Sequence, residues 1–533
     1  MTHPVPLTVR DVSHGYEGRT VLDAIDLTVA PGQRVGLIGE NGSGKSTLIR
    51  LVAGIEQPDH GTISTSDDRG YLAQDSGLDP DDTDGEVLTQ ALAPLHDAVA
   101  NLERLSHDLT DPVAAQAYDE LLGWATFHDA WDADRRAEVS AHHLGLDSID
   151  RSRTVAELSG GQRSRLALAA LLTRLPECLV LDEPTNHLDD QALDHLESEL
   201  VTLPGALLVA SHDRTFLDTV CTAVVDLDPS HFGTDGEGGR RFTGNYTAYL
   251  RSRHDSQRRW EVAYAAQQTK LADLRAAART TTTDVAHDRA ARDNDKFIHA
   301  FKGARVQKSA SRRSRDAQQR IEVLERDRVP KPRAPLRFAG DVTAAGAGAG
   351  SVRVRDLVVD GRVRVPRLDV AAGEHLLVEG ANGSGKSTLL QALAGRISPN
   401  AADMQVSARR IGLLTQDTEF ADPSATVRQT YRATDSEVLL GELGLIHPRD
   451  VDRPVALLSE GQKRRLALAV VIGRQPELLL LDEPTNHLSL LLVEELESAL
   501  ARTSVTVIVA SHDRWLRERW TGPRVLLSDG ATT

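Results

Sequence analysis

The stretch GENGSGKST at residues 39–47 decides the fold, and it occurs twice, because GANGSGKST follows at residues 380–388. Glycines at this spacing let successive backbone N–H groups cradle phosphates at a helix N-terminus. The lysine then reaches the outer phosphates, and the following serine is a Mg²⁺ ligand. The flanking sequence fits, since 34–38 reads as a short buried strand and 47–53 as a helix. Each copy therefore predicts an α/β nucleotide site.

The candidate phosphate-binding residues of both loops follow from this motif. In the first copy they are Gly39, Asn41, Gly42, Ser43, Gly44, Lys45, Ser46 and Thr47, and in the second Gly380, Asn382, Gly383, Ser384, Gly385, Lys386, Ser387 and Thr388.

A second repeated motif supplies paired carboxylates. LVLDEPTNHL at 179–188 recurs as LLLDEPTNHL at 479–488, in each case an apolar strand that ends in Asp-Glu. The aspartates, Asp182 and Asp482, are placed to hold Mg²⁺, and the glutamates, Glu183 and Glu483, to orient the attacking water. Adjacent carboxylates at a strand end are sometimes only structural, but the glycine-rich loop upstream argues against that reading here.

Two further side chains are expected to complete each site. Gln74 and Gln416 would lie near Mg²⁺ and the water, and His212 and His512 near the terminal phosphate. A single histidine after an apolar strand is usually a packed or surface residue. Here VASHDR is repeated at 209–214 and 509–514, which favours a catalytic role.

The discriminating motif is LSGGQ at 158–162, because small residues let backbone and serine approach a phosphate closely at a helix start. The second copy has LSEGQ. With the other motifs, the chain resembles the ATP-binding cassette (ABC) superfamily, in which the signature of one cassette closes over the nucleotide of the other. The resemblance implies ATP and Mg²⁺ as cofactors. It also implies nucleotide contacts from Ser159, Gly160, Gly161 and Gln162 on one side, and from Ser459, Gly461 and Gln462 on the other.

The two composite sites are not expected to be equivalent. Glu460 replaces a glycine in the second signature and brings a carboxylate near the first site's nucleotide. Tyr16 is placed to stack on adenine, and the second copy has no aromatic residue there. Ser489 also stands where the first copy has Asp189. Both sites are expected to bind ATP, with unequal hydrolysis rates.

The spacing of the motifs predicts the domain organisation. Lysine to lysine is 341 residues, but glutamate to glutamate is 300, so the first copy holds about 40 extra residues. Their helical spacing, broken at Thr110-Asp111-Pro112, predicts an inserted arm; a merely longer helical lobe is the alternative. The fold class is α/β, two tandem P-loop ABC ATPase domains joined by a long antiparallel α-helical linker. The predicted domains are 1–245 (arm at about 85–142), the linker 246–337, an Ala/Gly segment 338–350, and 351–533.

The linker differs sharply in charge from the rest of the chain. Residues 251–337 contain 22 lysines and arginines against 11 acids, within a chain of net charge −17. Such a segment is expected to seek polyanions. A solvated helix face is the plainer explanation of a charge run, but that would alternate signs. The candidate RNA contacts are Lys296, Lys302, Arg305, Lys308, Arg312, Arg313 and Arg315.

Two cassettes, an arm in the first and GNYTAYLRSR leading into a charged linker resemble the ABC-F family over essentially the whole chain. The second signature, the long linker and the short segment after His512 are most similar to its antibiotic-resistance branch. The resemblance implies an ATPase that binds the 70S ribosome in its ATP-bound state, with 23S rRNA and P-site tRNA as partners of the linker. It implies a monomer with an intramolecular cassette pair, and protection against macrolides, lincosamides or streptogramins.

Composition bounds the alternatives. Two cysteines cannot build a disulfide framework or a four-ligand zinc site, and no stretch approaches the length of a membrane span. A cytoplasmic protein with no membrane and no DNA partner is therefore expected. The rival readings are a housekeeping ABC-F translation factor and, from another class, the soluble ATPase of an exporter. The basic insert argues against the exporter, and a DNA-maintenance ATPase would be expected to bring zinc cysteines or a DNA-binding tail.

Overall fold

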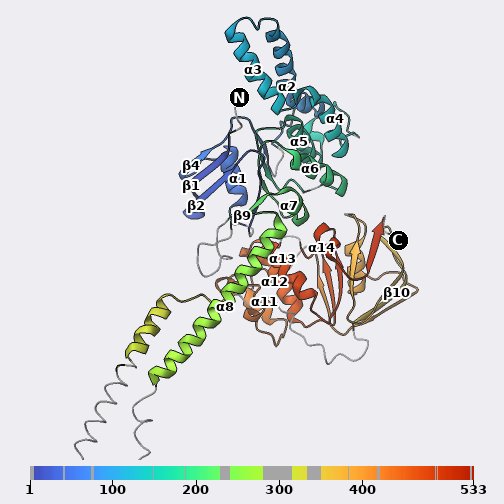
Figure 1. The fold of residues 1–533 in the computed structure, drawn as a ribbon. Coiled ribbons are helices and arrows are strands. Elements are labelled where there is room, and N and C mark those ends of the chain that lie inside the picture. Colours follow the sequence, from blue (N-terminus) through green and yellow to red (C-terminus); the bar gives the residue numbers. More distant parts are fainter. Residues whose placement is uncertain are drawn as a thin grey trace, which may run out of the picture. The chain divides into compact units, whose positions relative to one another are not determined.

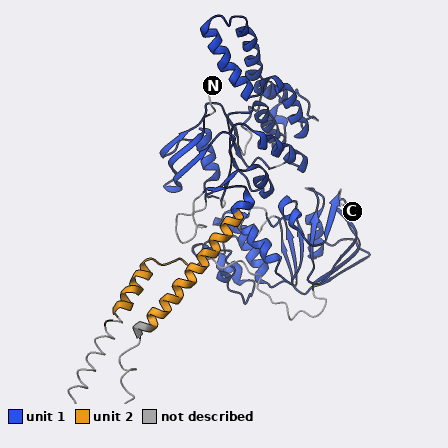
Figure 2. Ribbon diagram, viewed as in Figure 1, with its two compact units in different colours: residues 1–228, 240–249, 334–533 blue, residues 229–239, 250–333 orange. Residues whose placement is uncertain are grey.

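A computed structural model describes residues 5–39, 42–73, 77–147, 149–186, 188–227, 241–279, 312, 315–332, 350–381, 383–416, 420–485, 488, 490–528 and 531–532. The chain forms two compact units (Figure 2). The first contains both cassettes (1–228, 240–249 and 334–533), and the second contains 229–239 and 250–333. Each unit is described by itself below.

The first cassette is built on a six-stranded sheet of order β5-β6-β7-β3-β8-β9. Its parallel members are β5 (Arg69–Leu72), β6 (Cys178–Asp182), β7 (Ala206–Ala210), β3 (Arg34–Ile38) and β8 (Ala223–Asp226), and β9 (Arg241–Thr243) pairs antiparallel at the edge. Every residue of β6 and β7 is buried, because helices cover both faces of such a sheet and the strands become continuous apolar runs.

A separate antiparallel sheet of order β2-β1-β4 packs beside it, made of β1 (Leu7–Tyr16), β2 (Arg19–Val29) and β4 (His60–Ser64). Its apolar faces join β3 and helix α1 (Lys45–Ala53) in one core cluster. The remaining helices of the cassette are α2 (Asp84–Ser106), α3 (Pro112–Phe127), α4 (Ala133–His143), α5 (Gly160–Arg174), α6 (Asp190–Thr202) and α7 (Arg214–Val220) (Figure 1).

The insert of the first cassette is a helical hairpin. Helix α2 starts at a capping box between Thr83 and Glu86, and α3 starts at Pro112 with Asp111 as its N-cap. Leu95, Ala98 and Leu102 of α2 form a small core with Ala125 of α3. The hairpin thus carries its own apolar seam, as an arm requires.

The second cassette repeats this plan in one nine-stranded sheet of order β13-β10-β11-β18-β17-β12-β16-β15-β14. Its strands are β10 (Ser351–Val359), β11 (Val363–Val370), β12 (His375–Glu379), β13 (Asp403–Ser407), β14 (Ile411–Leu414), β15 (Leu478–Asp482), β16 (Thr506–Ala510), β17 (Arg524–Ser528) and β18 (Ala531–Thr532). Its helices are α10 (Lys386–Leu393), α11 (Val427–Arg432), α12 (Glu460–Gly473), α13 (Leu490–Leu500) and α14 (Arg514–Arg519).

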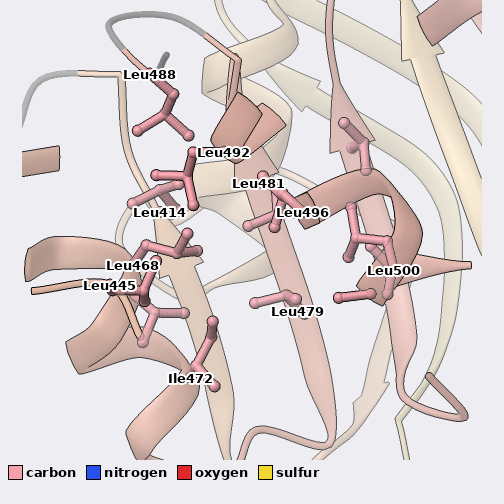
Figure 3. Packing of buried hydrophobic residues seen from close by; sticks show 14 of the residues in the cluster. Leu414, Leu445, Leu468, Ile472, Leu479, Leu481, Leu488, Leu492, Leu496 and Leu500 are labelled. Atoms are coloured by element: carbon pink, nitrogen blue, oxygen red, sulfur yellow. The ribbon is translucent and has the colours of Figure 1, made fainter. Parts of the chain in front are cut away.

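One apolar cluster fixes the helices of the second cassette on its sheet. Figure 3 shows Leu479 and Leu481 of β15 among side chains of α12, such as Leu468 and Ile472, and of α13, such as Leu496. These residues are almost fully buried. The packing sets α12, the helix after the second signature, firmly against the strand that ends in Asp482.

The linker begins with one long helix, α8 (Tyr246–Arg279), and residues 315–326 form a helix that returns beside it (Figure 1). Gln267 donates to the carbonyl of Asp327 at 2.9 Å, and Arg275 pairs with Glu325 at 2.8 Å. Trp260 donates to the carbonyl of Pro330 at 2.9 Å. As the residue number rises along α8, the number of its partner falls from 330 to 325. This order confirms the predicted antiparallel pair.

The two cassettes exchange reciprocal ion pairs within the first unit. Arg214, at the start of α7, pairs with Glu494, Glu497 and Asp513 at 3.1, 2.5 and 2.8 Å. Arg514, at the start of α14, pairs with Asp213 at 3.1 Å and also contacts Glu197. Arg214 is buried and the side chain of Arg514 is 11% exposed, and these partners are related by the same 300-residue offset as the repeated motifs. None of the helices in the described part of the chain has the length and apolarity to cross a membrane.

Candidate nucleotide sites

Three parallel strand ends build each site. In the first cassette the sheet order brings together the ends of β6, β7 and β3, which lead into Asp182-Glu183, Ser211-His212 and the glycine-rich loop. In the second, β15, β16 and β12 do the same. Ligand sites of parallel sheets lie at the carboxyl ends of their strands. Residues far apart in sequence therefore meet at one edge.

The glycine-rich loops have the backbone that a phosphate cradle needs. Gly44 and Gly385 have φ values of 97° and 95° and cap the N-termini of α1 and α10. A Cβ on Gly44 would lie 2.5 Å from Leu22, and one on Gly385 would lie 2.6 Å from the carbonyl oxygen of Arg362. Only glycine fits these positions, so the sequence motif reflects a steric requirement.

Polar atoms in these loops are suited to an anionic ligand. Lys45 and Lys386 are buried, and their ammonium groups donate to the carbonyls of Gly39 and Gly380 at 2.9 and 2.8 Å. The buried hydroxyls of Ser43 and Ser384 have no hydrogen-bond partner among the described residues. A triphosphate would supply acceptors to these donors, so the residues fit the nucleotide that the motif implies.

The metal-side residues also fit. Hydrogen bonds from Ser46 and Ser387 reach Asp182 and Asp482, both of which are buried. Burial raises the pKa of both aspartates, and the serine hydrogen bonds oppose that rise. A carboxylate and a hydroxyl held together in this way are hard oxygen ligands of the kind Mg²⁺ prefers.

Each catalytic glutamate lies against the histidine predicted to act with it. Glu183 is 3.4 Å from Nε2 of His212, whereas Glu483 is 2.8 Å from Nδ1 of His512. The second glutamate also lies 3.6 Å from the ammonium group of Lys386. Both glutamates have positive φ values, 52° and 44°, a strained conformation that functional sites often retain.

Electrostatics differ between the two pairs. Burial raises the pKa of Glu183 to about 7, and the charge of Lys45 and the amide of His212 oppose that rise. The hydrogen bond that the His512 imidazole donates to Glu483 raises the pKa of that imidazole. A glutamate that titrates near neutral pH is suited to exchange a proton with water during hydrolysis.

The two signatures have the same local structure. Ser159 and Ser459 are N-caps of α5 and α12, and each forms a capping box with the glutamine three residues later. Glu460, the residue that departs from the usual glycine, is exposed and pairs with Lys463 at 2.7 Å. The positive charge of Lys463 partly offsets the negative charge that Glu460 is predicted to bring near the first site. The pairing of each signature with the opposite nucleotide stays a prediction.

Tyr16 is the last residue of β1, and its stacking on adenine stays a prediction. Its ring is 40% exposed, and its hydroxyl receives a hydrogen bond from Arg50 at 2.8 Å and donates to Glu56 at 2.5 Å. His14 packs edge-on against the ring at 4.9 Å. Sequence reasoning identified the tyrosine but missed Arg50 and Glu56, which hold it.

Several predicted residues lie outside the described part of the chain. They are Asn41, Gln74, Asn382, Ser489, Lys296, Lys302, Arg305, Lys308 and Arg313. Of the candidate RNA contacts, Arg312 and Arg315 are described, and both are exposed. Gln416 is described, and its backbone is held by Arg464, a residue that the sequence analysis did not select.

Comparison with known proteins agrees with this geometry. A family model described as ABC transporter matches residues 22–186 and 363–486, which include the catalytic motifs of both cassettes up to the Asp-Glu pairs. The chain therefore belongs to the ABC family of ATP-binding cassettes.

Two relatives narrow this to a branch. The tylosin resistance ATP-binding protein TlrC of Streptomyces fradiae is 37% identical over 99% of this chain and 98% of its own length. The energy-dependent translational throttle protein EttA of Mycobacterium tuberculosis (strain H37Rv) is 30% identical over 96% and 89%. This full-length similarity, with two cassettes around a helical linker, makes the chain a member of the ABC-F family.

A solved structure supports the tandem fold. The archaeal ribosome recycling factor aABCE1, in complex with the stalk protein aP1, matches with a TM-score of 0.56 and 18% identity over 98% of this chain and 89% of that one. The expected α/β fold with two tandem cassettes is confirmed.

Proposed function

We propose that this protein is an ATP-hydrolysing ABC-F factor that binds the 70S ribosome in its ATP-bound state and protects it from macrolide, lincosamide or streptogramin antibiotics. Its linker would act at 23S rRNA and P-site tRNA, near the peptidyl-transferase centre. ATP and Mg²⁺ are the proposed cofactors of both nucleotide sites.

The observation that carries this proposal is the full-length similarity to a tylosin resistance protein, which spans both cassettes and the linker. A likeness confined to the cassettes would support only an ATPase. Similarity to a translational throttle protein supports the ribosome as the shared target. It also leaves a housekeeping translation factor as the second candidate.

The charge of the linker supports an RNA target. Its net charge of +11 over residues 251–337 contrasts with the acidic chain, and the described Arg312 and Arg315 are exposed. Arginine binds phosphate bidentately, and contacts of this kind bring affinity that falls steeply with salt. The acidic cassettes would repel the same backbone, so the linker is the segment suited to approach RNA.

The base of the linker is suited to follow the state of the cassettes. Tyr246, the first residue of α8, is fully buried, and its ring lies 5.6 Å from that of Trp515 in the second cassette. The guanidinium of Arg214, two residues after His212, lies 5.7 Å from the same indole. Tyr249 donates to Asp226 of the first cassette at 2.8 Å. Trp515, three residues after His512, thus contacts the start of α8 and also lies against Arg214, two residues after His212.

The chain's own residues then suggest a clamp. The lysines and glycine-rich loops bind the nucleotide phosphates, the Asp-Ser pairs hold the metal, and Glu183 and Glu483 orient water and accept its proton. The bound metal supplies charge neutralisation on the phosphates. Closure would reorient α8 through Tyr246 and Trp515, provided that ATP binds the closed state more tightly than the open one. Hydrolysis would reopen the clamp and release the ribosome.

Ribosome binding tests the proposal directly. A protein with both Glu183→Gln and Glu483→Gln should co-sediment with 70S ribosomes in ATP, because hydrolysis can no longer reopen the clamp. Changing Arg312, Arg313 and Arg315 to Gln in this protein should weaken binding. The slope of log affinity against log salt concentration should become shallower by about 0.7 to 0.9 for each lost phosphate contact. Sedimentation free of ribosomes in ATP would refute the proposal.

A matched control and a drug test separate the alternatives. Arg353, Arg396 and Arg432 are exposed arginines of the second cassette, and changing them to Gln removes the same charge from a surface away from the linker sequence. That variant should bind as the parent does. Expression of the parent in a sensitive bacterium should raise resistance to at least one of these drug classes. Ribosome binding without any change in susceptibility would favour the housekeeping factor.

A further inference from the structure

Arg464 occupies a position that no catalytic motif assigns. It lies on α12, five residues after the signature serine Ser459, and it is 2% exposed. A buried guanidinium is costly unless all of its surroundings accept hydrogen bonds. Its burial therefore needs an explanation.

The partners of Arg464 come from two separate parts of the second nucleotide site. One terminal nitrogen donates to the carbonyls of Thr415 and Gln416, the latter at 3.0 Å. The other donates to the carbonyls of Asp482 and Glu483 at 2.8 and 2.9 Å. The planar fork thus joins the loop that bears Gln416 to the strand end that bears both carboxylates.

Among the described residues of the first cassette, which exclude Gln74, the signature helix has no arginine at the matching position. The same position of its signature helix is Ser164, whose hydroxyl donates to the carbonyl of Gly160 at 3.2 Å, within its own helix. A serine side chain is too short to bridge two distant backbone segments. The two sites therefore share their candidate catalytic residues but differ at this position of the signature helix.

We infer that Arg464 is a positioning residue of the second nucleotide site, which fixes the backbone of Gln416 against Asp482 and Glu483 before any ligand binds. This inference rests on the proposed ATP hydrolysis, in which Gln416 lies near Mg²⁺ and the attacking water. Four carbonyl acceptors suit arginine and no other residue, because a lysine is a point donor without the planar fork. The loop is then held in place by the protein alone.

The arginine also joins the two composite sites. Helix α12 carries Ser459, the residue expected to contact the nucleotide of the first site, while Arg464 holds the loop of the second. In the second cassette these two parts are therefore one rigid piece. In the first cassette, with Ser164, the corresponding parts have no such connection through this side chain.

Hydrogen exchange of the nucleotide-free protein tests whether Arg464 holds the glutamine loop, without measuring ATP hydrolysis. Arg464→Ser, which copies the first cassette, should speed exchange in the segment 411–416 by about tenfold or more, because two hydrogen bonds from a charged donor are lost. Segment 69–73 of the first cassette serves as the internal reference. Lys463→Ser is the matched control, since Lys463 is the preceding basic residue and pairs only with exposed Glu460 among the described residues. Unchanged exchange in 411–416 would overturn the inference.

Mg²⁺ dependence distinguishes positioning from simple stability. In a protein that carries Glu183→Gln, ATP hydrolysis reports the second site. There, Arg464→Ser should raise the Mg²⁺ concentration for half-maximal rate about tenfold. The thermal midpoint should be unchanged; if it falls, the rates are corrected for the fraction of folded protein. Arg464→Lys, which keeps the charge and the volume, should show the same shift. A fall in thermal stability with an unaltered Mg²⁺ requirement in both variants would refute the inference. Exchange is measured without ribosomes, so its outcome is independent of whether the protein binds them.

Discussion

The two cassettes carry the same catalytic motifs but support them with different neighbours. In the first, Tyr16 is held by Arg50 and Glu56, and the signature helix has Ser164. In the second, Arg464 clamps the glutamine loop, and the positions that match Arg50 and Glu56 are Gln391 and Ile397. We therefore expect the first site to differ from the second in how it holds a base, and the second to differ in how firmly it holds its glutamine loop. Catalytic motifs alone would make the two sites look alike.

We expect this difference to give the two sites separate tasks in one hydrolysis cycle. A pre-positioned loop favours rapid hydrolysis once the cassettes close, because less rearrangement remains at the moment of reaction. A base platform favours selective binding. We therefore expect the first site to govern nucleotide choice and the second to carry more of the turnover.

Removing the two candidate catalytic glutamates, first together and then one at a time, gives the largest expected effect. The double variant Glu183→Gln with Glu483→Gln should lower the rate about 10²-fold or more, the usual contribution of a positioned base. Glu483→Gln alone should lower total ATP hydrolysis more than Glu183→Gln alone. Steady-state phosphate release at saturating Mg²⁺ and ATP measures this.

Equal ATP hydrolysis rates in the two single variants would contradict the expected difference between the two sites. His96→Gln is a suitable control, because His96 pairs with Asp134 on the exposed face of the arm rather than with any strand end of a nucleotide site. That variant should retain the parental rate. If the hydrolysis rates of the two glutamate variants fall equally, the different supporting residues of the two sites have no kinetic consequence.

The pH profile of each site sharpens the comparison. Burial raises the pKa of Glu183 to about 7, and the residue must be ionised to accept a proton from water. In the Glu483→Gln protein, which leaves only the first site, the rate should therefore fall about tenfold per pH unit as pH drops below about 7. The Glu183→Gln protein gives the reference profile under the same conditions. A first-site rate that stays flat between pH 6 and 8 would contradict this assignment.

Sequence reasoning identified what repeats and missed what does not. The glycine-rich loops, the Asp-Glu pairs and the tandem α/β fold were predictable because phosphate binding and parallel strands leave strong local patterns. Arg464 leaves no such pattern, since an arginine in a helix usually lies at the surface. Its partners are backbone carbonyls 18 to 49 residues away in sequence, which only the packing of α12 on β15 brings together.

A smaller lesson concerns the turn of the arm, where the sequence analysis placed the helix break at Thr110-Asp111-Pro112. Helix α2 ends at Ser106, and Leu109 is 47% exposed in the turn. The N-cap Asp111 and Pro112 begin the next helix too early for α2 to continue. Arg214 and Arg514 stood inside a quoted repeat, but their reciprocal pairing was not predicted, because a repeat offset does not show which residues of the two copies meet.

The smallest expected effect concerns the base platform. Arg50→Gln and Glu56→Ile copy the second cassette and release the hydroxyl of Tyr16, so the ring is no longer fixed against a bound purine. An aromatic contact of this kind is worth about 1 kcal/mol, which is about fivefold in affinity. First-site affinity for ATP should fall by that factor, measured by titration of a protein in which Lys386→Ala removes phosphate binding at the second site and Glu183→Gln stops hydrolysis at the first. Inorganic triphosphate has no base, so its affinity should be unchanged.

Gln391→Ala with Ile397→Ala, at the matching positions of the second cassette, should leave ATP affinity at the first site unaltered. An equal loss for inorganic triphosphate would mean that the substitutions disturb α1 and its phosphate loop, and the two sites would then not differ in how they recognise the base.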